Sequence, residues 1–210
     1  SPNNFTEAGG LVYFTATDGV NGIELWKSDG TALGTVMAKD INEAAGAASS
    51  PANLTNVNGV LFFTATDGIN GVELWKSDPV TGVTELVKDI NTAAGAASSP
   101  ATLTNVNGIL YFRANDGIHG NELWRSDGTD AGTEMVADLY PGNVGGNPTN
   151  LCAANGVLYF NANDGMTGFD LWMSRGTSAT TVPAGDINPG AGCSNPTGLT
   201  ALGCQILFTA

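Results

Sequence analysis

The chain has 210 residues, of which 42% are hydrophobic and 8% aromatic, so it carries ample material for a packed core and is not a disordered segment. Its 20 acidic and 7 basic residues give a formal net charge of −13 at pH 7, which repels phosphate backbones and anionic headgroups and disfavours nucleic-acid and membrane-surface binding. No apolar run reaches the roughly 18 residues of a membrane-spanning helix, so membrane insertion is not expected.

An internal repeat organises the chain. Four tryptophans recur at spacings of 49, 49 and 48 residues, within the sequence motifs IELWKSDGT, VELWKSDPV, NELWRSDGT and FDLWMSRGT. Five prolines recur at spacings of 49, 49, 48 and 48 residues. The chain therefore divides into repeats 2–50, 51–99, 100–147 and 148–195, with a partial fifth repeat over 196–210. The tryptophans are Trp26, Trp75, Trp124 and Trp172, and the prolines are Pro2, Pro51, Pro100, Pro148 and Pro196.

Each repeat is expected to form four short strands, which the second repeat shows in chain order. The first strand covers 53–57 and ends at Asn58-Gly59, a pair that favours a tight hairpin turn. The second covers 60–66 and is apolar at both alternating sets of positions, so both of its faces need cover. The third and fourth strands cover 72–76 and 83–88. No segment has a useful helical period, so the cover must come from other sheets.

Four-stranded antiparallel units that cover one another are the blades of a β-propeller. We therefore expect an all-β single domain over 1–210, with four full blades of about 49 residues and a partial fifth. The connector between the fourth strand of one repeat and the proline of the next, such as 41–50, is long enough to cross a blade to the next inner edge. A β-sandwich or a solenoid of hairpins is the competing architecture.

The recurring ELWKSDGT text, with the GT and DI that follow it, resembles the ELWxxDGT repeat family of bacterial extracellular β-propeller proteins. The resemblance covers essentially the whole chain and is strongest in the first and third repeats. The second repeat has Pro79 where glycine is expected, and the fourth has Asp170, Met173 and Arg175 at positions of Glu, a basic residue and Asp. The family implies a secreted or cell-surface location and a repeat architecture, and it implies no established catalytic activity.

The partial fifth repeat stops inside a second strand, so its edge is expected to be open. Three explanations stay open: a fragment of a longer protein, a ring closed by a half blade, or completion by a strand from another chain. The apolar edge residues are Ile206, Leu207 and Phe208, and an unpaired edge of this kind invites strand addition.

An Asp-Gly pair follows each second strand, and a second acidic residue lies six positions after the Asp. The pairs are Asp18 with Glu24, Asp67 with Glu73, Asp116 with Glu122, and Asp164 with Asp170. Carboxylates on both sides of a turn are candidate calcium ligands, although no D-x-D-x-D-G loop is present. We favour the structural alternative, in which Asp supports the turn and Glu accepts turn hydrogen bonds. Calcium is thus a candidate, and no cofactor is required.

Two further acidic sets recur. Asp29, Asp78 and Asp127 lie in the turn between the third and fourth strands, where Ser and Asp oxygens are expected to accept hydrogen bonds from turn amides. Asp40, Asp89, Asp138 and Asp186 end the fourth strand and are expected to protect the outer edge with charge, a ring of ligand sites being the alternative.

The tryptophans are expected to fill the space between blades, with their indole N–H groups bonded locally. Exposed platforms for sugar stacking are the alternative. Cys152, Cys193 and Cys204 fall outside the repeat plan, and in an oxidising compartment they predict one disulfide, between Cys193 and either of the others, with one remaining thiol. Three buried free thiols are the alternative. Asn4-Phe5-Thr6 and Asn53-Leu54-Thr55 fit the N-glycosylation pattern.

Catalysis is not expected. The single histidine, His119, takes a repeat position that holds Asn21, Asn70 and Thr167 in the other repeats, so it is interpreted as a variable turn residue. The sequence has no nucleophile elbow, HExxH, CxxC or phosphate-binding loop.

These patterns predict a non-catalytic, extracellular or cell-surface β-propeller that acts as a structural or adhesive module. It would assemble into a filament or matrix through its incomplete terminal blade, with itself or cell-surface and matrix components as partners. The alternative is a multivalent carbohydrate-binding propeller with one shallow, calcium-assisted glycan site per blade.

Overall fold

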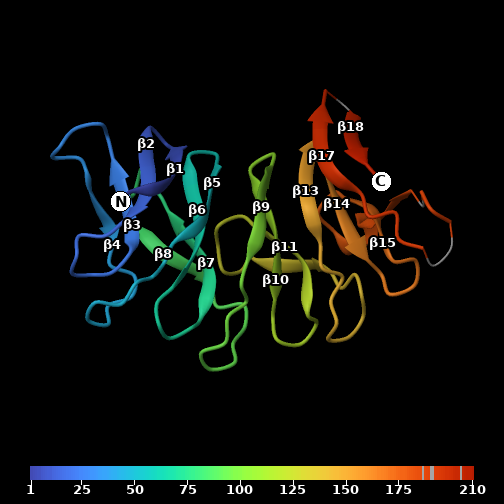
Figure 1. The fold of residues 1–210 in the computed structure, drawn as a ribbon, viewed down its shortest axis with the longest axis horizontal. Helices are drawn as coiled ribbons and strands as arrows, with labels where there is room; N and C mark the ends of the chain where they lie inside the picture. The colour runs from blue at the N-terminus through green and yellow to red at the C-terminus, as the bar shows by residue number, and fades with distance from the viewer. Residues whose placement is uncertain (186, 190–191, 204) are drawn as a thin grey trace. The chain divides into compact units, whose positions relative to one another are not determined.

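The computed structural model describes residues 1–185, 187–189, 192–203 and 205–210, and over these residues the chain is almost entirely strands and turns (Figure 1). It divides into two compact units, Ser1–Pro100 and Ala101–Ala210. Cys204 and Asp186, both singled out in the sequence, lie outside the described residues. A search of the described residues finds no helix that is long and apolar enough to span a membrane.

The N-terminal unit contains two four-stranded antiparallel sheets in which each strand pairs with the next along the chain. The first sheet consists of β1 (Asn3–Ala8), β2 (Leu11–Ala16), β3 (Glu24–Ser28) and β4 (Val36–Lys39). The second consists of β5 (Ala52–Val57), β6 (Val60–Thr66), β7 (Val72–Ser77) and β8 (Thr84–Lys88). The strands predicted for the second repeat are therefore confirmed to within one residue. The first strands of the two sheets, β1 and β5, lie side by side (Figure 1).

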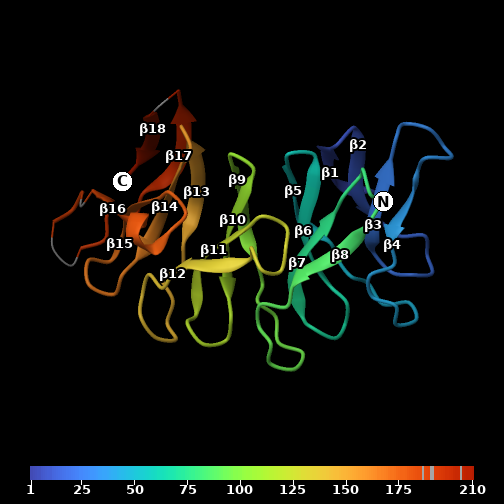
Figure 2. The ribbon, with the colours of Figure 1, turned by 180° about the vertical axis from the view of Figure 1, so that it is seen from behind.

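The C-terminal unit contains two more sheets of the same kind and a two-stranded one (Figure 2). The third sheet consists of β9 (Ala101–Val106), β10 (Ile109–Asn115), β11 (Asn121–Ser126) and β12 (Glu134–Ala137). The fourth consists of β13 (Thr149–Ala154), β14 (Val157–Asn163), β15 (Phe169–Ser174) and β16 (Val182–Gly185), with the single-turn helix η1 (Ser178–Thr180) before its last strand. The hairpin of β17 (Thr197–Leu202) and β18 (Gln205–Thr209) follows, and β13 contacts both β9 and β17.

Left-handed backbone conformations recur at matching places in the repeats. The predicted hairpin turn is confirmed, because Asn58 and Gly59 have φ angles of 52° and 88°, the sign that a type I′ turn requires at both central residues. A second left-handed residue interrupts the pairing of each first strand; these residues are Asn4, Asn53, Thr102, Asn150 and Gly198. A third precedes the repeat proline, at Ser50, Ser99, Asn147 and Asn195.

Apolar side chains fill the space between successive sheets within each unit. In the N-terminal unit, one cluster joins Ala8, Tyr13, Leu25 and Ile41 of the first repeat with Leu61, Phe63, Ala65 and Trp75 of the second. In the C-terminal unit, the matching cluster joins residues of the third repeat, such as Leu123, with Phe160 and Trp172 of the fourth. Residues 61–65 of β6 are all buried, and within this unit Leu61, Phe63 and Ala65 pack against the first sheet.

Candidate functional site

A buried carboxylate at the start of β3 holds the connector that leads to the next repeat. Glu24 is fully buried and accepts hydrogen bonds from the backbone N–H of Ile41 at 3.1 Å and of Ser49 at 2.7 Å. The Ser49 hydroxyl donates a further short hydrogen bond to Glu24. The carboxylate therefore bridges the beginning and the end of the connector, and we call this arrangement the connector clamp.

The second repeat has the same clamp. Glu73 in β7 accepts hydrogen bonds from the backbone N–H of Ile90 at 3.2 Å and of Ser98 at 2.6 Å, and from the Ser98 hydroxyl. The identical partners show that the acidic residue of the ELW text and the serine two positions before the repeat proline act together. The sequence placed the hydrogen bonds of this acidic residue in its own turn; the structure places them in the connector, because the side chain points into the sheet interior rather than toward the turn.

In the third repeat the clamp has no serine, and backbone N–H groups alone donate to the carboxylate. Glu122 in β11 accepts hydrogen bonds from the backbone N–H groups of Leu139 at 2.8 Å, Gly146 at 2.7 Å and Tyr140 at 3.3 Å. Three amide donors thus take the place of the two amides and one hydroxyl of the N-terminal unit.

The fourth repeat has the least complete clamp. Asp170 in β15 is shorter by one methylene group and, among the described residues, accepts hydrogen bonds from Ser194 only, at 3.3 Å from its backbone N–H and 2.6 Å from its hydroxyl. Its Oδ2 atom is buried and has no hydrogen-bond partner among the described residues. The first part of this connector, which includes Ile187, is consequently not held by the carboxylate in the way that Ile41 is.

Burial governs the electrostatics of the glutamate clamps. Desolvation raises the pKa of Glu24 and Glu73, although the hydrogen bonds from the connector oppose the shift. The same cause raises the pKa of Glu122 to about 7. Glu24, Glu73 and Glu122 therefore hold their protons more strongly than an exposed glutamate does.

The other member of each candidate calcium pair is used by its own turn. Asp18 accepts hydrogen bonds from the backbone N–H of Val20 and Asn21 through Oδ1, at 2.8 and 2.9 Å, and from the Asn21 side-chain amide through Oδ2 at 2.8 Å. The backbone hydrogen bonds from Asn21 and Val20 lower its pKa. The equivalent turns repeat these backbone contacts at Asp67, Asp116 and Asp164. Within the described ranges, no group of three or more His, Cys, Asp or Glu residues is placed to hold a metal ion.

His119 belongs to one of these turns. Its Nδ1 atom lies 2.7 Å from Oδ2 of Asp116, where Asn21 and Asn70 place their side-chain amides in the other repeats. The side-chain hydrogen bond with Asp116 raises the pKa of His119. His119 therefore lies in this turn, at the position that the repeat predicts.

The acidic residues between the third and fourth strands form the predicted turn contacts. Asp29 accepts hydrogen bonds from the backbone N–H and the hydroxyl of Thr31 at 2.9 and 2.7 Å, and Ser28 accepts one from Gly30 at 3.0 Å. Asp78 and Asp127 bond the corresponding turn residues. At the ends of the fourth strands, Asp138 is exposed, and Asp40 and Asp89 are half-buried.

The tryptophans mostly pack between sheets. Trp75, Trp124 and Trp172 have exposed fractions of 5%, 7% and 8%, so they offer no open platform for sugar stacking. Trp26 is half-buried, and its Nε1 donates to the backbone oxygen of Ala16 at 3.1 Å. The other three indole N–H groups are buried without a hydrogen-bond partner among the described residues, so the expectation of local bonding is right only for Trp26.

The cysteines do not form the bridge considered between two of them. Cys152 in β13 is half-buried, Cys193 is exposed, and both are free thiols. The Cys193 sulfur lies against Gly168, just before β15, whereas Cys152 lies in β13, which β14 separates from β15. A pairing that involves Cys204 falls outside the described residues.

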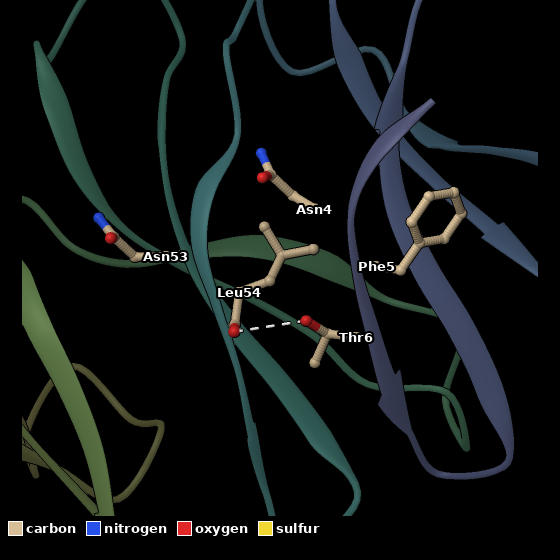
Figure 3. A pocket seen from close by; sticks show the side chains of 5 residues that line it. All are labelled: Asn4, Phe5, Thr6, Asn53 and Leu54. Atoms are coloured by element: carbon tan, nitrogen blue, oxygen red, sulfur yellow. Dashed lines mark hydrogen bonds between the residues drawn. The ribbon is translucent and has the colours of Figure 1, made fainter. Parts of the chain in front are cut away.

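A shallow pocket of about 230 Å³ lies between β1 and β5 (Figure 3). Asn4, Phe5, Thr6, Asn53 and Leu54 line it, and the Thr6 hydroxyl donates to the Leu54 backbone oxygen at 3.5 Å. In Figure 3 the Leu54 side chain extends toward Asn4, whereas the Phe5 ring points away from the other four residues. Both asparagines of the N-glycosylation patterns are exposed here. The lining contains only neutral side chains, so the pocket has few means of selecting a ligand.

A second pocket of the N-terminal unit, of about 260 Å³, has a richer lining, which consists of Lys39, Ile41, Glu43, Asp67, Ile69 and Trp75. Lys39 Nζ lies 5.6 Å from the centroid of the Trp75 ring and 3.4 Å from the backbone oxygen of Thr84, to which it donates. We call it the Lys39–Trp75 pocket. Sequence reasoning missed it because its walls come from two consecutive repeats, and only packing brings Lys39 next to Trp75.

Comparison with known proteins shows the fold of the chain but neither its family nor its function. No protein-family model matches the chain, and no curated protein sequence matches it. Among solved structures, puromycin hydrolase is similar with a TM-score of 0.54 and 13% identity over 89% of this chain. A structure from an analysis of two prolyl endopeptidases has a TM-score of 0.54 and 14% identity over 95% of this chain. This chain spans 30% of the length of each of these proteins. The chain has a β-propeller-like all-β fold of four-stranded antiparallel sheets.

Proposed function

We propose that the chain is a non-catalytic structural module, a set of four β-propeller blades and a partial fifth, that associates end to end with further copies of itself. A secreted or cell-surface location, with cell-surface or matrix components as further partners, belongs to this proposal through the ELWxxDGT resemblance. The recurring carboxylates support it, since the clamp and turn acids are committed to holding backbone.

The observation that carries the proposal is that two different apolar faces, which cover each other between neighbouring blades, are also found exposed elsewhere in the chain. Inside the N-terminal unit, one blade presents Ala8, Tyr13 and Leu25, and the next blade covers them with Leu61 and Phe63, with Leu54 packed alongside. We call the first set the leading face and the second set the receiving face. The two faces differ in composition, so a contact between them is heterologous.

Each kind of face is also found uncovered. In the first blade, the repeat equivalents of Leu54 and Leu61 are Phe5 and Val12, which are 64% and 41% exposed. Phe5 stacks on Phe14 with the ring centroids 5.5 Å apart, so this receiving face is an aromatic surface. Exposed apolar surface of this kind is typical of an interaction site.

The β17–β18 hairpin carries the complementary surface. Leu202 and Leu207 take the repeat positions of Ala8 and Tyr13, and they are 60% and 56% exposed. In the hairpin, β18 pairs only with β17 among the described strands, whereas the second strands of the full blades pair on both sides. A second copy can therefore offer a leading face to the receiving face of the first. A pair joined by this contact keeps one free face of each kind, and repetition of the contact builds a filament when the rotation between copies does not close a ring.

Sedimentation velocity over a range of protein concentrations tests this proposal. The wild type is expected to associate as concentration rises, and Val12→Lys or Leu207→Lys is expected to abolish long assemblies. A mixture of the two variants is expected to form heterodimers, because each variant keeps the face that the other has lost. Leu33→Lys is the matched control, since Leu33 is 95% exposed and belongs to neither face. A protein that stays monomeric at every concentration would overturn the proposal. This includes a monomer in which the two faces of one chain cover each other.

A further inference from the structure

The Lys39–Trp75 pocket combines charged, apolar and hydrogen-bonding groups in one place of the N-terminal unit. We propose that it binds one neutral saccharide unit. The site is independent of the end-to-end association, because neither Lys39 nor Trp75 belongs to an exposed end face.

The free hydrogen-bonding capacity of the lining favours a ligand rich in hydroxyl groups. Lys39 has three N–H donors, of which the contact with Thr84 uses one. The Trp75 N–H is buried, so it is not counted among the groups that meet a ligand. Asp67 already accepts three hydrogen bonds from its turn, which leaves it about one further lone pair. A hydroxyl accepts from Lys39 and donates to Asp67, so sugar hydroxyls suit both groups.

The charges of the pocket disfavour ionic ligands. Glu43 and Asp67 oppose an anion, and Lys39 opposes a cation. The Asp67 carboxylate is also largely saturated by turn amides, so it is better suited to one hydroxyl than to an ammonium group. A neutral ligand avoids both conflicts.

The apolar part of the pocket completes the match. Ile41 and Trp75 are 4% and 5% exposed and form the floor of the pocket, whereas Ile69 is 72% exposed and stands at the rim. The C–H groups of a pyranose ring can pack on Ile69 while its hydroxyls face the polar groups. The volume of about 260 Å³ suits a ligand of one ring rather than a chain of sugars inside the pocket.

The C-terminal unit offers an internal comparison. At its Trp172, the repeat equivalent of Lys39 is Ala137, which is buried in the same cluster as Trp172. The Tyr140 ring packs closely against Gly165, whereas Asn42 lies at the corresponding Gly68. Trp172 also has a buried N–H without a partner among the described residues, but it lacks the neighbouring ammonium. A ligand that needs Lys39 should therefore reach Trp75 and not Trp172.

The indole N–H signals of the four tryptophans in a ¹H–¹⁵N correlation spectrum test the proposal. They are assigned with single Trp→Phe variants, and methyl glycosides of glucose, galactose, mannose, fucose and N-acetylglucosamine are titrated separately into the full chain. We expect at least one glycoside to shift the Trp75 signal to saturation, with the Trp26 and Trp172 signals unchanged. A dissociation constant of about 1 mM is expected for one small, partly open site.

Two variants separate binding from a general disturbance. Lys39→Ala installs the residue that the third repeat has at this position and is expected to weaken binding roughly tenfold or more, equivalent to about 1.4 kcal/mol. Leu33→Lys changes an exposed residue away from the pocket and should leave the titration unchanged. No Trp75 shift with any glycoside, an equal shift of Trp172, or unchanged binding by Lys39→Ala would each overturn the proposal.

Discussion

The connectors of the two compact units are held by the same device with different completeness. Glu24 and Glu73 each accept three hydrogen bonds from their connector. Glu122 also accepts three, but in the part of the chain that the structure describes Asp170 accepts hydrogen bonds from Ser194 alone. The comparison teaches that the reach of the acidic side chain, and not only its charge, decides whether both ends of a connector are fixed.

Removal of the clamp carboxylate should give the largest difference between the two units. Glu73→Ala leaves two backbone N–H groups and a hydroxyl without their acceptor and opens a cavity, so we expect a loss of about 4 kcal/mol in the free energy of unfolding. Asp170→Ala removes contacts with one residue only and should lose about 1 to 2 kcal/mol. Urea unfolding of both variants measures this, and equal losses would contradict the difference in completeness.

The pH dependence of stability should carry the signature of Glu122. Its pKa is raised to about 7 in the folded chain, so between the unfolded value of about 4.5 and 7 the folded state binds more protons than the unfolded state. Stability from this group is therefore fully present below that range and is lost as pH rises through it. Melting temperatures of wild type and Glu122→Gln from about pH 4 to about pH 8 measure the effect.

The glutamine variant should be less stable overall, because its side-chain N–H₂ group then faces a backbone donor. It should also show a smaller decline across the same pH range, since the amide has no proton to lose where the native carboxyl titrates. Parallel curves for the two proteins would show that Glu122 does not titrate as inferred.

A bulge residue distinguishes the third repeat from its neighbours on a smaller scale. Thr102 has a φ of 58°, whereas the first strands on either side of it in sequence have Asn53 and Asn150 at this position. A β-branched residue is strained in the left-handed region and asparagine is not, so Thr102→Asn should stabilise the chain by about 1 kcal/mol. The reverse change, Asn53→Thr, is the control and should destabilise by a similar amount. If the two variants do not change the melting temperature in opposite directions, the strain assigned to Thr102 is refuted.

Extension of the fourth clamp should bring the two units closer in stability. Asp170→Glu adds the missing methylene group and lets the carboxylate reach the backbone N–H of Ile187, the counterpart of Ile41. We expect a gain of about 0.5 to 1 kcal/mol from the added hydrogen bond, measured by urea unfolding. Glu73→Asp is the paired control and should weaken the second clamp. A loss of stability in Asp170→Glu would mean that this connector does not accept the longer side chain.

Local features of the repeat could be predicted from the sequence. The four strands follow from alternating apolar residues, the Asn58-Gly59 turn from the positive φ that both residues tolerate, and the Asp29 contacts from turn chemistry. Each of these depends on residues that are close in the chain. Composition and the period between tryptophans were sufficient to predict sheets that cover one another.

The contacts that matter most for the candidate sites could not be predicted in the same way. Glu24 and Ser49 are distant in sequence, and their bond depends on how the connector folds back into the sheet. A signal was present, because the acidic residue and a serine near the repeat proline recur together, but periodicity does not show which recurring positions touch. The position of Lys39 over Trp75 likewise depends on the packing of one repeat on the next.

The connector clamp has a mechanical consequence. Each clamp is rooted in the sheet of one repeat but grips the segment that leads out of it, so the repeats are coupled in series rather than fixed independently. A pulling force applied to the two termini would have to break these clamps one after another. The Asp170 clamp, which has Ser194 as its one hydrogen-bond partner among the described residues, is expected to break first.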